Sequence, residues 1–233
     1  MTPQPTDPRI ERGMSRQLEE RRRLLRSGGR HIGWKAGFGA PAALQRFGLT
    51  GPLVGFLTDA TIVANGASVA VAGWANPVAE PELAVHIGTD VPGRAGTDRV
   101  GEAISAIRPA IELADIDPPT DDVEEVLAGD IFHRAVVLGH PDPTLAGGIT
   151  EGLTGVVTHD GTRLQPITDL EAHTGRLPDV VAHIADTLAE AGETLLAGDV
   201  VITGSVIPAI PIGPGQSVEF RLGDSAPVSV RLY

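Results

Sequence analysis

Two glutamates, Glu80 and Glu82, stand two residues apart in the stretch 76–88 and are followed by an apolar run. If this stretch is extended, side chains at positions i and i+2 project from the same face, so both carboxylates point the same way. Two adjacent negative charges are costly unless a cation lies between them or one carboxylate takes a proton. A divalent cation that prefers carboxylate oxygen would satisfy both. The alternative is a pair of solvated glutamates on a strand edge.

A third glutamate, Glu112, lies thirty residues further on in the run Pro-Ala-Ile-Glu-Leu-Ala-Asp at residues 109–115. The apolar composition of this run predicts a buried strand. A carboxylate in such surroundings needs a partner, because burying it alone is costly. Glu112 therefore favours a metal site over a solvated edge, and it supplies a third oxygen ligand.

One lysine, Lys35, stands among small and aromatic residues in the segment 31–39. Glycines around it allow the backbone to approach whatever the lysine contacts. The alternative is a core strand from which the lysine extends to water. Gly37 and Gly39 do not make a nucleotide-binding fingerprint, because the third glycine and the preceding strand are missing.

The overall composition excludes several classes of function. The net charge of −12 argues against a general nucleic-acid binder or a protein of anionic membranes. The absence of cysteine excludes disulfides, thiolate nucleophiles and cysteine-ligated zinc. No signal peptide or membrane-spanning run is apparent, so we expect a cytoplasmic protein with a small-molecule substrate, no nucleic acid and no membrane.

The 29 glycines and 19 prolines, with 3% aromatic residues, predict short strands joined by tight turns. Helices are expected at residues 10–26, 42–47, 97–107, 123–127 and 178–192, and hairpins at residues 62–71, around Asn65-Gly66, and 153–164. Residues 1–30 are interpreted as a disordered lead-in (1–8) and a helix. Residues 31–233 are interpreted as a single domain.

Four motifs in order resemble a known family: Gly33-Trp34-Lys35, Glu80-Pro81-Glu82, Pro109-Ala-Ile-Glu112 and the run from Leu196 to Ser205. The chain from about Ile32 onward resembles the 2-keto-4-pentenoate hydratase and 4-oxalocrotonate decarboxylase group of the fumarylacetoacetate hydrolase superfamily. The resemblance implies an α+β, mainly β fold, in which a distorted β-barrel or roll carries a few covering helices. It also implies a homo-oligomer, a dimer or larger.

The resemblance assigns roles to particular residues. It implies that Glu80, Glu82 and Glu112 bind Mg²⁺ or Mn²⁺, that Lys35 transfers protons or binds a carboxylate, and that Asp59 is a second proton-transfer group. The residues expected to contact substrate are Trp34, Phe56, Leu57, Thr203, Gly204 and Ser205.

The implied activity is that of a divalent-metal-dependent lyase acting on a small enolisable 2-oxo acid, by hydration of a 2-hydroxypenta-2,4-dienoate-type substrate. The family's Gly-His-Pro motif is missing from residues 173–178, and Gly129-Asp130 stands where hydratases carry Asp-Asn. These departures motivate the alternatives of a 2-oxo acid decarboxylase, an acylpyruvate-type hydrolase, or a noncatalytic or repurposed biosynthetic member.

Overall fold

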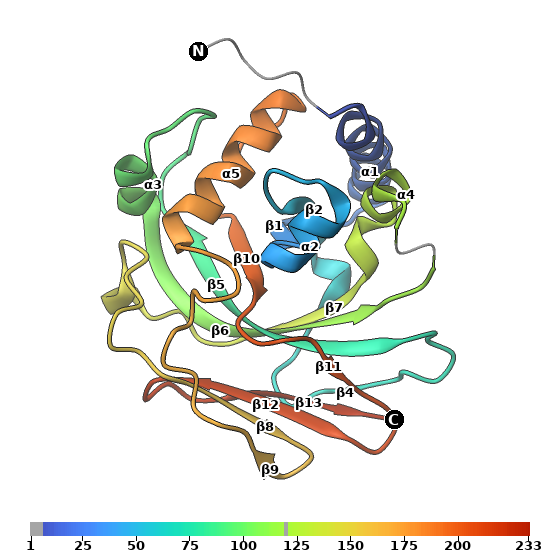
Figure 1. The fold of residues 1–233 in the computed structure, drawn as a ribbon, viewed down its shortest axis with the longest axis vertical. Coiled ribbons are helices and arrows are strands. Elements are labelled where there is room, and N and C mark those ends of the chain that lie inside the picture. Colours follow the sequence, from blue (N-terminus) through green and yellow to red (C-terminus); the bar gives the residue numbers. More distant parts are fainter. Residues whose placement is uncertain (1–6, 119–120) are drawn as a thin grey trace.

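The computed structural model describes residues 7–118 and 121–233, in which two β-sheets pack together and the helices lie against the larger one (Figure 1). The larger sheet of the described chain has eight strands in the order β2-β1-β10-β5-β6-β7-β3, with β11 paired to β5. The smaller sheet has five, in the order β4-β13-β12-β8-β9. The larger sheet curls strongly into a half-barrel, and the smaller sheet packs against β6 and β7. The expectation of an α+β, mainly β roll with a few covering helices is confirmed.

The strands of the larger sheet are β1 (His31–Gly37), β2 (Leu53–Thr58), β3 (Ile62–Val63), β5 (Pro77–Ile87), β6 (Ile104–Asp115), β7 (His133–Leu138), β10 (Val200–Ser205) and β11 (Ile210–Pro211). Those of the smaller sheet are β4 (Ser68–Val69), β8 (Gly155–His159), β9 (Thr162–Arg163), β12 (Ser217–Leu222) and β13 (Val228–Leu232). The helices are α1 (Pro8–Arg26), α2 (Pro41–Phe47), α3 (Thr97–Ala103), α4 (Val123–Ala128) and α5 (Leu177–Glu190), with short 3-10 turns η1 (Asp59–Thr61), η2 (Asp130–Phe132) and η3 (Pro143–Leu145). Among the described residues, none of these helices is long and apolar enough to cross a membrane.

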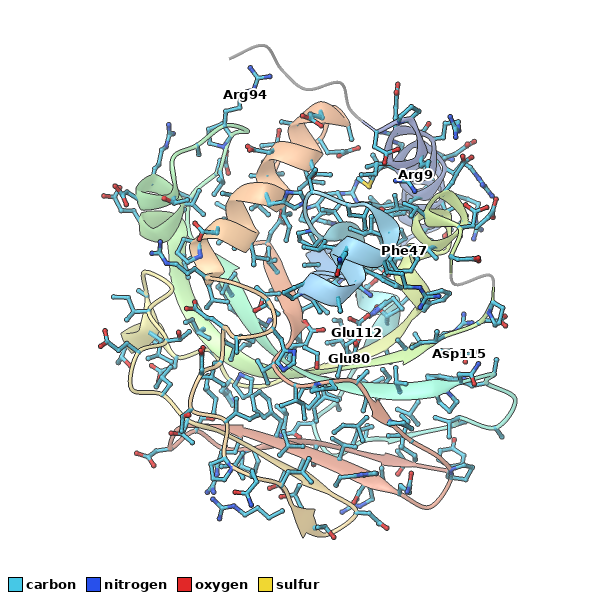
Figure 2. The ribbon with its side chains drawn as sticks, viewed as in Figure 1. Arg9, Phe47, Glu80, Arg94, Glu112 and Asp115 are labelled. Carbon is cyan, nitrogen blue, oxygen red and sulfur yellow. The ribbon has the colours of Figure 1, made fainter. Side chains whose placement is uncertain are left out.

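Helix α1 is joined to the rest of the molecule by buried and polar contacts. The Asp7 side chain caps its first turn by accepting a hydrogen bond from the Arg9 backbone nitrogen. Arg9 Nη2 donates to the Phe47 carbonyl oxygen at 3.2 Å (Figure 2). Met14 and Leu18 enter the main core. The predicted lead-in falls largely on residues 1–6, which lie outside the described chain, and the division near residue 30 stays a prediction.

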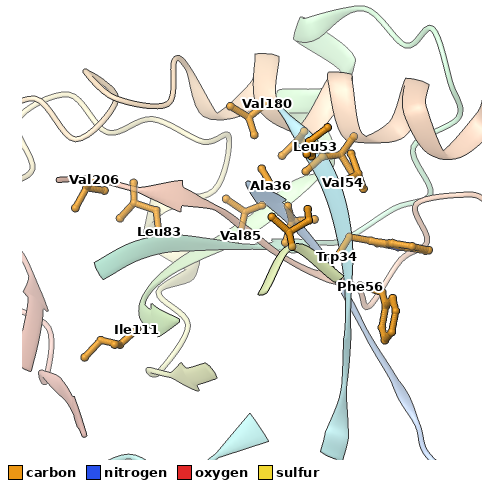
Figure 3. Packing of buried hydrophobic residues seen from close by; sticks show 14 of the residues in the cluster. Trp34, Ala36, Leu53, Val54, Phe56, Leu83, Val85, Ile111, Val180 and Val206 are labelled. Carbon is orange, nitrogen blue, oxygen red and sulfur yellow. The ribbon is translucent and has the colours of Figure 1, made fainter. Parts of the chain in front are cut away.

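The long strands β5 and β6 divide the side chains between two faces. Leu83 and Val85 of β5 belong to the main hydrophobic core, which also includes Ile111 of β6 and Val180 of α5 (Figure 3). Residues at intervening positions point the opposite way, because successive side chains of a strand alternate. The apolar face anchors these strands, and the other face is left for polar groups.

The hairpin expected around Asn65-Gly66 is wrong, although a turn is present. Strand β3 pairs in parallel with β7 of the larger sheet, whereas β4 pairs in parallel with β13 of the smaller one. Asn65 Nδ2 donates to the Pro227 carbonyl at 2.9 Å, and its Oδ1 accepts from the Ser229 nitrogen at 2.8 Å. These long-range bonds tie the turn to β13, so the turn carries the chain from one sheet to the other. The second expected hairpin, formed by β8 and β9, is confirmed.

The helix expected over residues 97–107 ends early. Helix α3 stops at Ala103, and Ile104 begins β6, where it pairs with Ile87. Ile104 and Ile107 are both buried, as expected, but they are strand residues. Pairing with the long strand β5 prevails over the local helical pattern, since β-branched isoleucine fits a pleated surface well.

Gly33 permits the close approach of β1 and β10. A Cβ atom built on it would lie 1.9 Å from the Val200 carbonyl oxygen. Gly28 also has a positive φ, of 100°, but an added Cβ there would meet no atom within 4 Å.

We expect Gly33→Ala to lower the free energy of unfolding by about 2 kcal/mol or more relative to Gly28→Ala, because only Gly33→Ala adds a clash to the backbone strain. Denaturant titration measures this difference, and equal midpoints would refute the close-approach argument.

Candidate active site

The three glutamates converge on one face of the larger sheet. Glu80 of β5 is directly opposite Glu112 of β6 in the strand register, and Glu82 lies two residues along β5. Figure 2 shows Glu80 and Glu112 close together on these strands. One potential ligand oxygen from each of the three carboxylates lies within 4.8 Å of the others. Alternation along a strand and pairing between strands therefore build the cluster.

The cluster carries more negative charge than its surroundings offset. Glu82 and Glu112 are 1% exposed. Burial, followed by the charge of Glu112, raises the pKa of Glu80 to about 7. Burial, followed by the charges of Glu112 and Glu80, raises the pKa of Glu82 well above its usual value, although the Gly204 nitrogen donates to its Oε2 at 2.7 Å. A divalent cation coordinated by oxygen would remove this conflict, so the donor set fits Mg²⁺, Mn²⁺ or Ca²⁺.

Lys35 reaches the cluster from β1. It pairs with Ile202 of β10, which pairs with Ala84 of β5, and this register places its side chain over the glutamate face. Its Nζ donates to Glu112 Oε1 and to the Ile131 carbonyl oxygen, the latter at 3.3 Å. Burial alone would lower the pKa of Lys35, but the charges of Glu112 and Asp130 outweigh it and raise the pKa. Lys35 is therefore a buried ammonium, not a lysine that extends to water.

The Lys35 ammonium has a strong effect on Glu112. Burial favours the neutral acid, but Lys35 and His133 together lower the pKa of Glu112 to about 2. Glu112 is thus ionised across the whole physiological range, while Glu80 exchanges its proton near neutrality. Glu112 therefore has a counter-charge in Lys35, whereas Glu80 and Glu82 have no ion-pair partner among the described residues.

Asp130 is a site residue that sequence reasoning did not identify. Its Oδ1 accepts a hydrogen bond from the Phe56 nitrogen at 2.9 Å, and burial raises its pKa to about 6. A Cβ on Gly55 would lie 2.6 Å from this oxygen and 2.7 Å from Lys35 Cγ, so Gly55 leaves room for both side chains. The available signal was a carboxylate between a glycine and an apolar strand, at the place where the family carries Asp-Asn.

These groups open into a cavity of about 240 Å³. Lys35, Glu80 and Glu82 are its charged lining residues in the described chain. The remaining wall includes polar residues (His173, Thr174, Gly204 and Ser205) and a larger apolar part (Ala36, Phe38, Ala40, Ala43, Ala114, Ile116, Ile131, Phe132, Ile207, Pro208 and Ala209). This volume is below the roughly 300–1,000 Å³ of typical drug-sized sites, and it suits a small acid.

The six residues expected to contact substrate divide into two groups. Gly204 and Ser205 line the cavity. Thr203 lies behind it, where its hydroxyl donates to the Leu83 carbonyl at 3.0 Å. Trp34 neighbours Lys35 in the strand and so faces the other way, with its indole nitrogen donating to Asp199 Oδ2 at 3.1 Å.

Phe56 and Leu57 also lie outside the cavity lining. Phe56 packs in the main core, and Leu57 belongs to a smaller apolar cluster with Ala84 and Ala110. Trp34, Phe56, Leu57 and Thr203 therefore do not line the cavity in the described chain, because their side chains are committed to packing or to hydrogen bonds elsewhere. Their direct contact with substrate stays a prediction.

Asp59 is also outside the cavity lining. It lies in η1, just beyond the end of β2, and its Oδ2 accepts from Arg30 Nε at 3.0 Å. Its pKa is lowered by hydrogen bonds from the Arg30 backbone and side chain, so it is an ordinary ionised surface carboxylate. Proton transfer by Asp59 stays a prediction, whereas Asp130 is a carboxylate beside Lys35.

Removal of one ligand should abolish tight metal binding. Glu82→Gln keeps an oxygen that can accept from the Gly204 nitrogen but removes the charge, so we expect the variant to lose stoichiometric Mn²⁺ binding in a titration followed by electron paramagnetic resonance. Glu219 is exposed on β12 and provides the matched control, in which Glu219→Gln binds one ion per chain like the unmodified protein. Unchanged binding by Glu82→Gln would refute the ligand assignment.

Metal binding and stability should both depend on pH. The pKa of Glu80 is raised from its usual 4.5 to about 7, so between these values the folded metal-free protein binds more protons than the unfolded chain. This contribution to stability is present below the unfolded pKa and is lost as the pH rises through the folded pKa. A divalent ion binds the ionised form, so Mg²⁺ should raise the melting temperature more at about pH 8 than at about pH 5.5. Equal shifts at the two pH values would contradict the assignment.

Comparisons with known proteins agree with the family resemblance. The model of the fumarylacetoacetate hydrolase C-terminal family matches residues 40–232. The 4-oxalocrotonate decarboxylase of Pseudomonas sp. (strain CF600) is 27% identical over an alignment of 220 residues that covers 92% of this chain and 82% of that protein. The 2-hydroxyhexa-2,4-dienoate hydratase of Comamonas testosteroni is 27% identical over an alignment of 216 residues that covers 88% of this chain and 79% of that protein.

A solved structure also resembles this fold. The 4-oxalocrotonate decarboxylase from Pseudomonas putida G7, complexed with magnesium and adipate, superposes with a TM-score of 0.85 at 27% identity, covering 93% of this chain and 83% of that one. Because the family model covers most of the chain and this fold agrees with it, the protein belongs to the fumarylacetoacetate hydrolase C-terminal family.

Proposed function

We propose that this protein is a divalent-metal-dependent lyase that adds water to a short 2-oxo acid of the 2-hydroxypenta-2,4-dienoate type. Mg²⁺ or Mn²⁺ would be held by Glu80, Glu82 and Glu112. The observation that carries the proposal is the convergence of three carboxylates and a buried ammonium at the charged end of a small, otherwise mainly apolar cavity. A magnesium complex of the Pseudomonas putida G7 decarboxylase supports the choice of metal.

A divalent ion held by these three glutamates would supply Lewis-acid chemistry at the oxygen atoms of a 2-oxo acid. The chain's own groups hold the proton. The Lys35 ammonium lies against the cluster, where it donates toward developing negative charge or delivers a proton to substrate carbon. Asp130, whose pKa is raised to about 6 by burial, contributes negative charge beside Lys35. Burial of these groups strengthens each interaction, because water is excluded.

The wall of the cavity favours an uncharged substrate tail. Beyond the cluster, the side chains of Phe38, Ile131, Phe132 and Ile207 provide apolar surface. Among the described lining residues, Lys35 is the one permanent cation, and its Nζ is already paired with Glu112. A second carboxylate at the far end of a substrate would be buried without a partner, at a cost of several kcal/mol. A vinyl or alkyl tail has no such cost, and this difference favours hydration of a monocarboxylate.

Decarboxylation is the second candidate, and the similarity to 4-oxalocrotonate decarboxylases favours it. An apolar wall can also promote loss of CO₂, because it desolvates the departing carboxylate. The two reactions use the same metal and the same lysine, so the substrate tail distinguishes them.

Product analysis separates the two candidates. Purified protein with Mg²⁺ is incubated with 2-hydroxypenta-2,4-dienoate or with 4-oxalocrotonate, and products are followed by ultraviolet absorbance and proton NMR. We expect the dienoate to be converted to 4-hydroxy-2-oxopentanoate, with no turnover after metal chelation. If 4-oxalocrotonate were turned over and the dienoate were not, decarboxylation would replace hydration as the proposed reaction. No turnover of either acid would contradict the proposed function.

Lys35 offers a direct test of the proton-transfer role. Lys35→Met removes the ammonium while keeping similar bulk, and we expect kcat to fall by about 10²–10⁴-fold, the usual contribution of a positioned proton donor. Trp34→Phe is the control, because Trp34 is adjacent in β1 but faces the Asp199 side. A loss of kcat as large in Trp34→Phe as in Lys35→Met would contradict this assignment.

We further propose that the chain works in the cytoplasm as a homo-oligomer, a dimer or larger. The resemblance to the hydratase and decarboxylase group supports the assembly, and the absence of cysteine is compatible with a reducing compartment. Light scattering coupled to size-exclusion chromatography measures the mass directly. A single-chain mass at micromolar concentration would refute the oligomer.

A further inference from the structure

His133 is a buried side chain at the edge of the glutamate cluster that the proposed reaction does not use. Its side chain is 2% exposed, and its Nδ1 lies 2.7 Å from Glu112 Oε1. Its Nε2 lies 2.9 Å from the Thr61 hydroxyl oxygen. The ring therefore links Glu112 to the turn that follows β2.

A local irregularity of the sheet aims this side chain. Leu113 of β6 pairs with Ala135 of β7, but the next residue, Ala114, pairs with His133, so one residue of β7 is left over. Such a bulge redirects a side chain and is frequent beside functional sites. Without it, His133 would follow the alternation of the strand and point away from Glu112.

The turn that leads into β7 is also unusual. Asp130, Ile131 and Phe132 have φ values of 54°, 54° and 62°, in the left-handed region. Positive φ is costly for residues other than glycine, above all for a β-branched isoleucine. This turn aligns the Ile131 carbonyl with Lys35 Nζ immediately before His133. The strained turn therefore lies in a segment whose groups converge on the Lys35–Glu112 pair.

The hydrogen-bond directions follow from the partners. Glu112 is an ionised carboxylate and can only accept, so His133 Nδ1 donates to its Oε1, while the Thr61 hydroxyl oxygen holds the other ring nitrogen, Nε2, at 2.9 Å. On the other side, His133 Nδ1 and Lys35 Nζ both address Glu112 Oε1. Within the described chain, no hydrogen bond is made to Glu112 Oε2. Two donors therefore hold one oxygen of the carboxylate, and the other oxygen is available to a cation.

We propose that His133 is a positioning residue which, together with Lys35, fixes the rotation of the Glu112 carboxylate so that Oε2 is presented to the metal. The inference rests on the proposed metal site and adds a residue to it. Without this tether, repulsion from the carboxylates of Glu80 and Glu82 would turn Glu112 away from them. Partners of metal ligands of this kind contribute about 10–100-fold to metal affinity.

Two substitutions of His133 test the position of the donor. The amide nitrogen of asparagine overlies the place of Nδ1, and that of glutamine overlies the place of Nε2. We expect His133→Asn to keep the dissociation constant of Mn²⁺ within about threefold of the unmodified protein, and His133→Gln to raise it by about 10–100-fold. Mn²⁺ binding is measured by electron paramagnetic resonance without substrate, and denaturant unfolding of the metal-free proteins compares their stability.

A second pair leaves His133 in place. Thr61→Val removes the hydroxyl that holds the ring, whereas Thr61→Ser keeps it. We therefore expect Thr61→Val to weaken Mn²⁺ binding and Thr61→Ser to leave it unchanged. Equal affinities in all four variants and the unmodified protein would overturn the positioning role. Equal losses in His133→Asn and His133→Gln would reduce it to a packing role and also overturn it. If the unmodified protein bound no Mn²⁺, the metal site itself would fail together with this inference.

Discussion

Repulsion among three clustered carboxylates, two of them buried, is the interaction on which the rest of the site depends. Glu80, Glu82 and Glu112 meet on one face of a sheet whose other face is committed to the hydrophobic core. The Lys35 ammonium offsets one of the three charges, and a bound divalent cation would offset the remaining two. The raised pKa of Glu80 and the lowered pKa of Glu112 are two consequences of this one arrangement. The charge that is costly in the metal-free protein is what attracts the ion.

The fold supplies this arrangement mainly through backbone geometry. Register between β5 and β6 sets Glu80 opposite Glu112, and close packing at Gly33 and Gly55 brings Lys35 within reach. The bulge at the start of β7 then adds His133 on the outer side of Glu112. Each device is local, but each works only because the long strands are held in place by the apolar residues at alternate positions. The same strands therefore account for both stability and chemistry.

Sequence reasoning identified the three clustered glutamates and Lys35 but not Asp130 and His133, for physical reasons. The i, i+2 spacing of Glu80 and Glu82 and the apolar run around Glu112 follow from strand alternation, which is a local rule. Asp130 and His133 depend on a left-handed turn and a bulge, for which a single sequence has no reliable signal. Alternation along β1 predicts that Trp34 faces away from the side of the sheet that Lys35 faces, because neighbours in a strand point opposite ways. The fold class was predictable from motifs in order, whereas the Asn65 turn depended on partners more than 160 residues away.

The most direct test of the account is a crystal grown with Mn²⁺ and oxalate, measured for anomalous scattering from manganese. Oxalate mimics the chelating end of a 2-oxo acid enolate, so the same experiment locates the substrate end. The account predicts one strong anomalous peak, from a manganese ion coordinated by an oxygen of each of Glu80, Glu82 and Glu112. Oxalate should lie on the open side of the ion, toward the apolar wall. A manganese peak elsewhere on the chain, or none at this cluster, would contradict it.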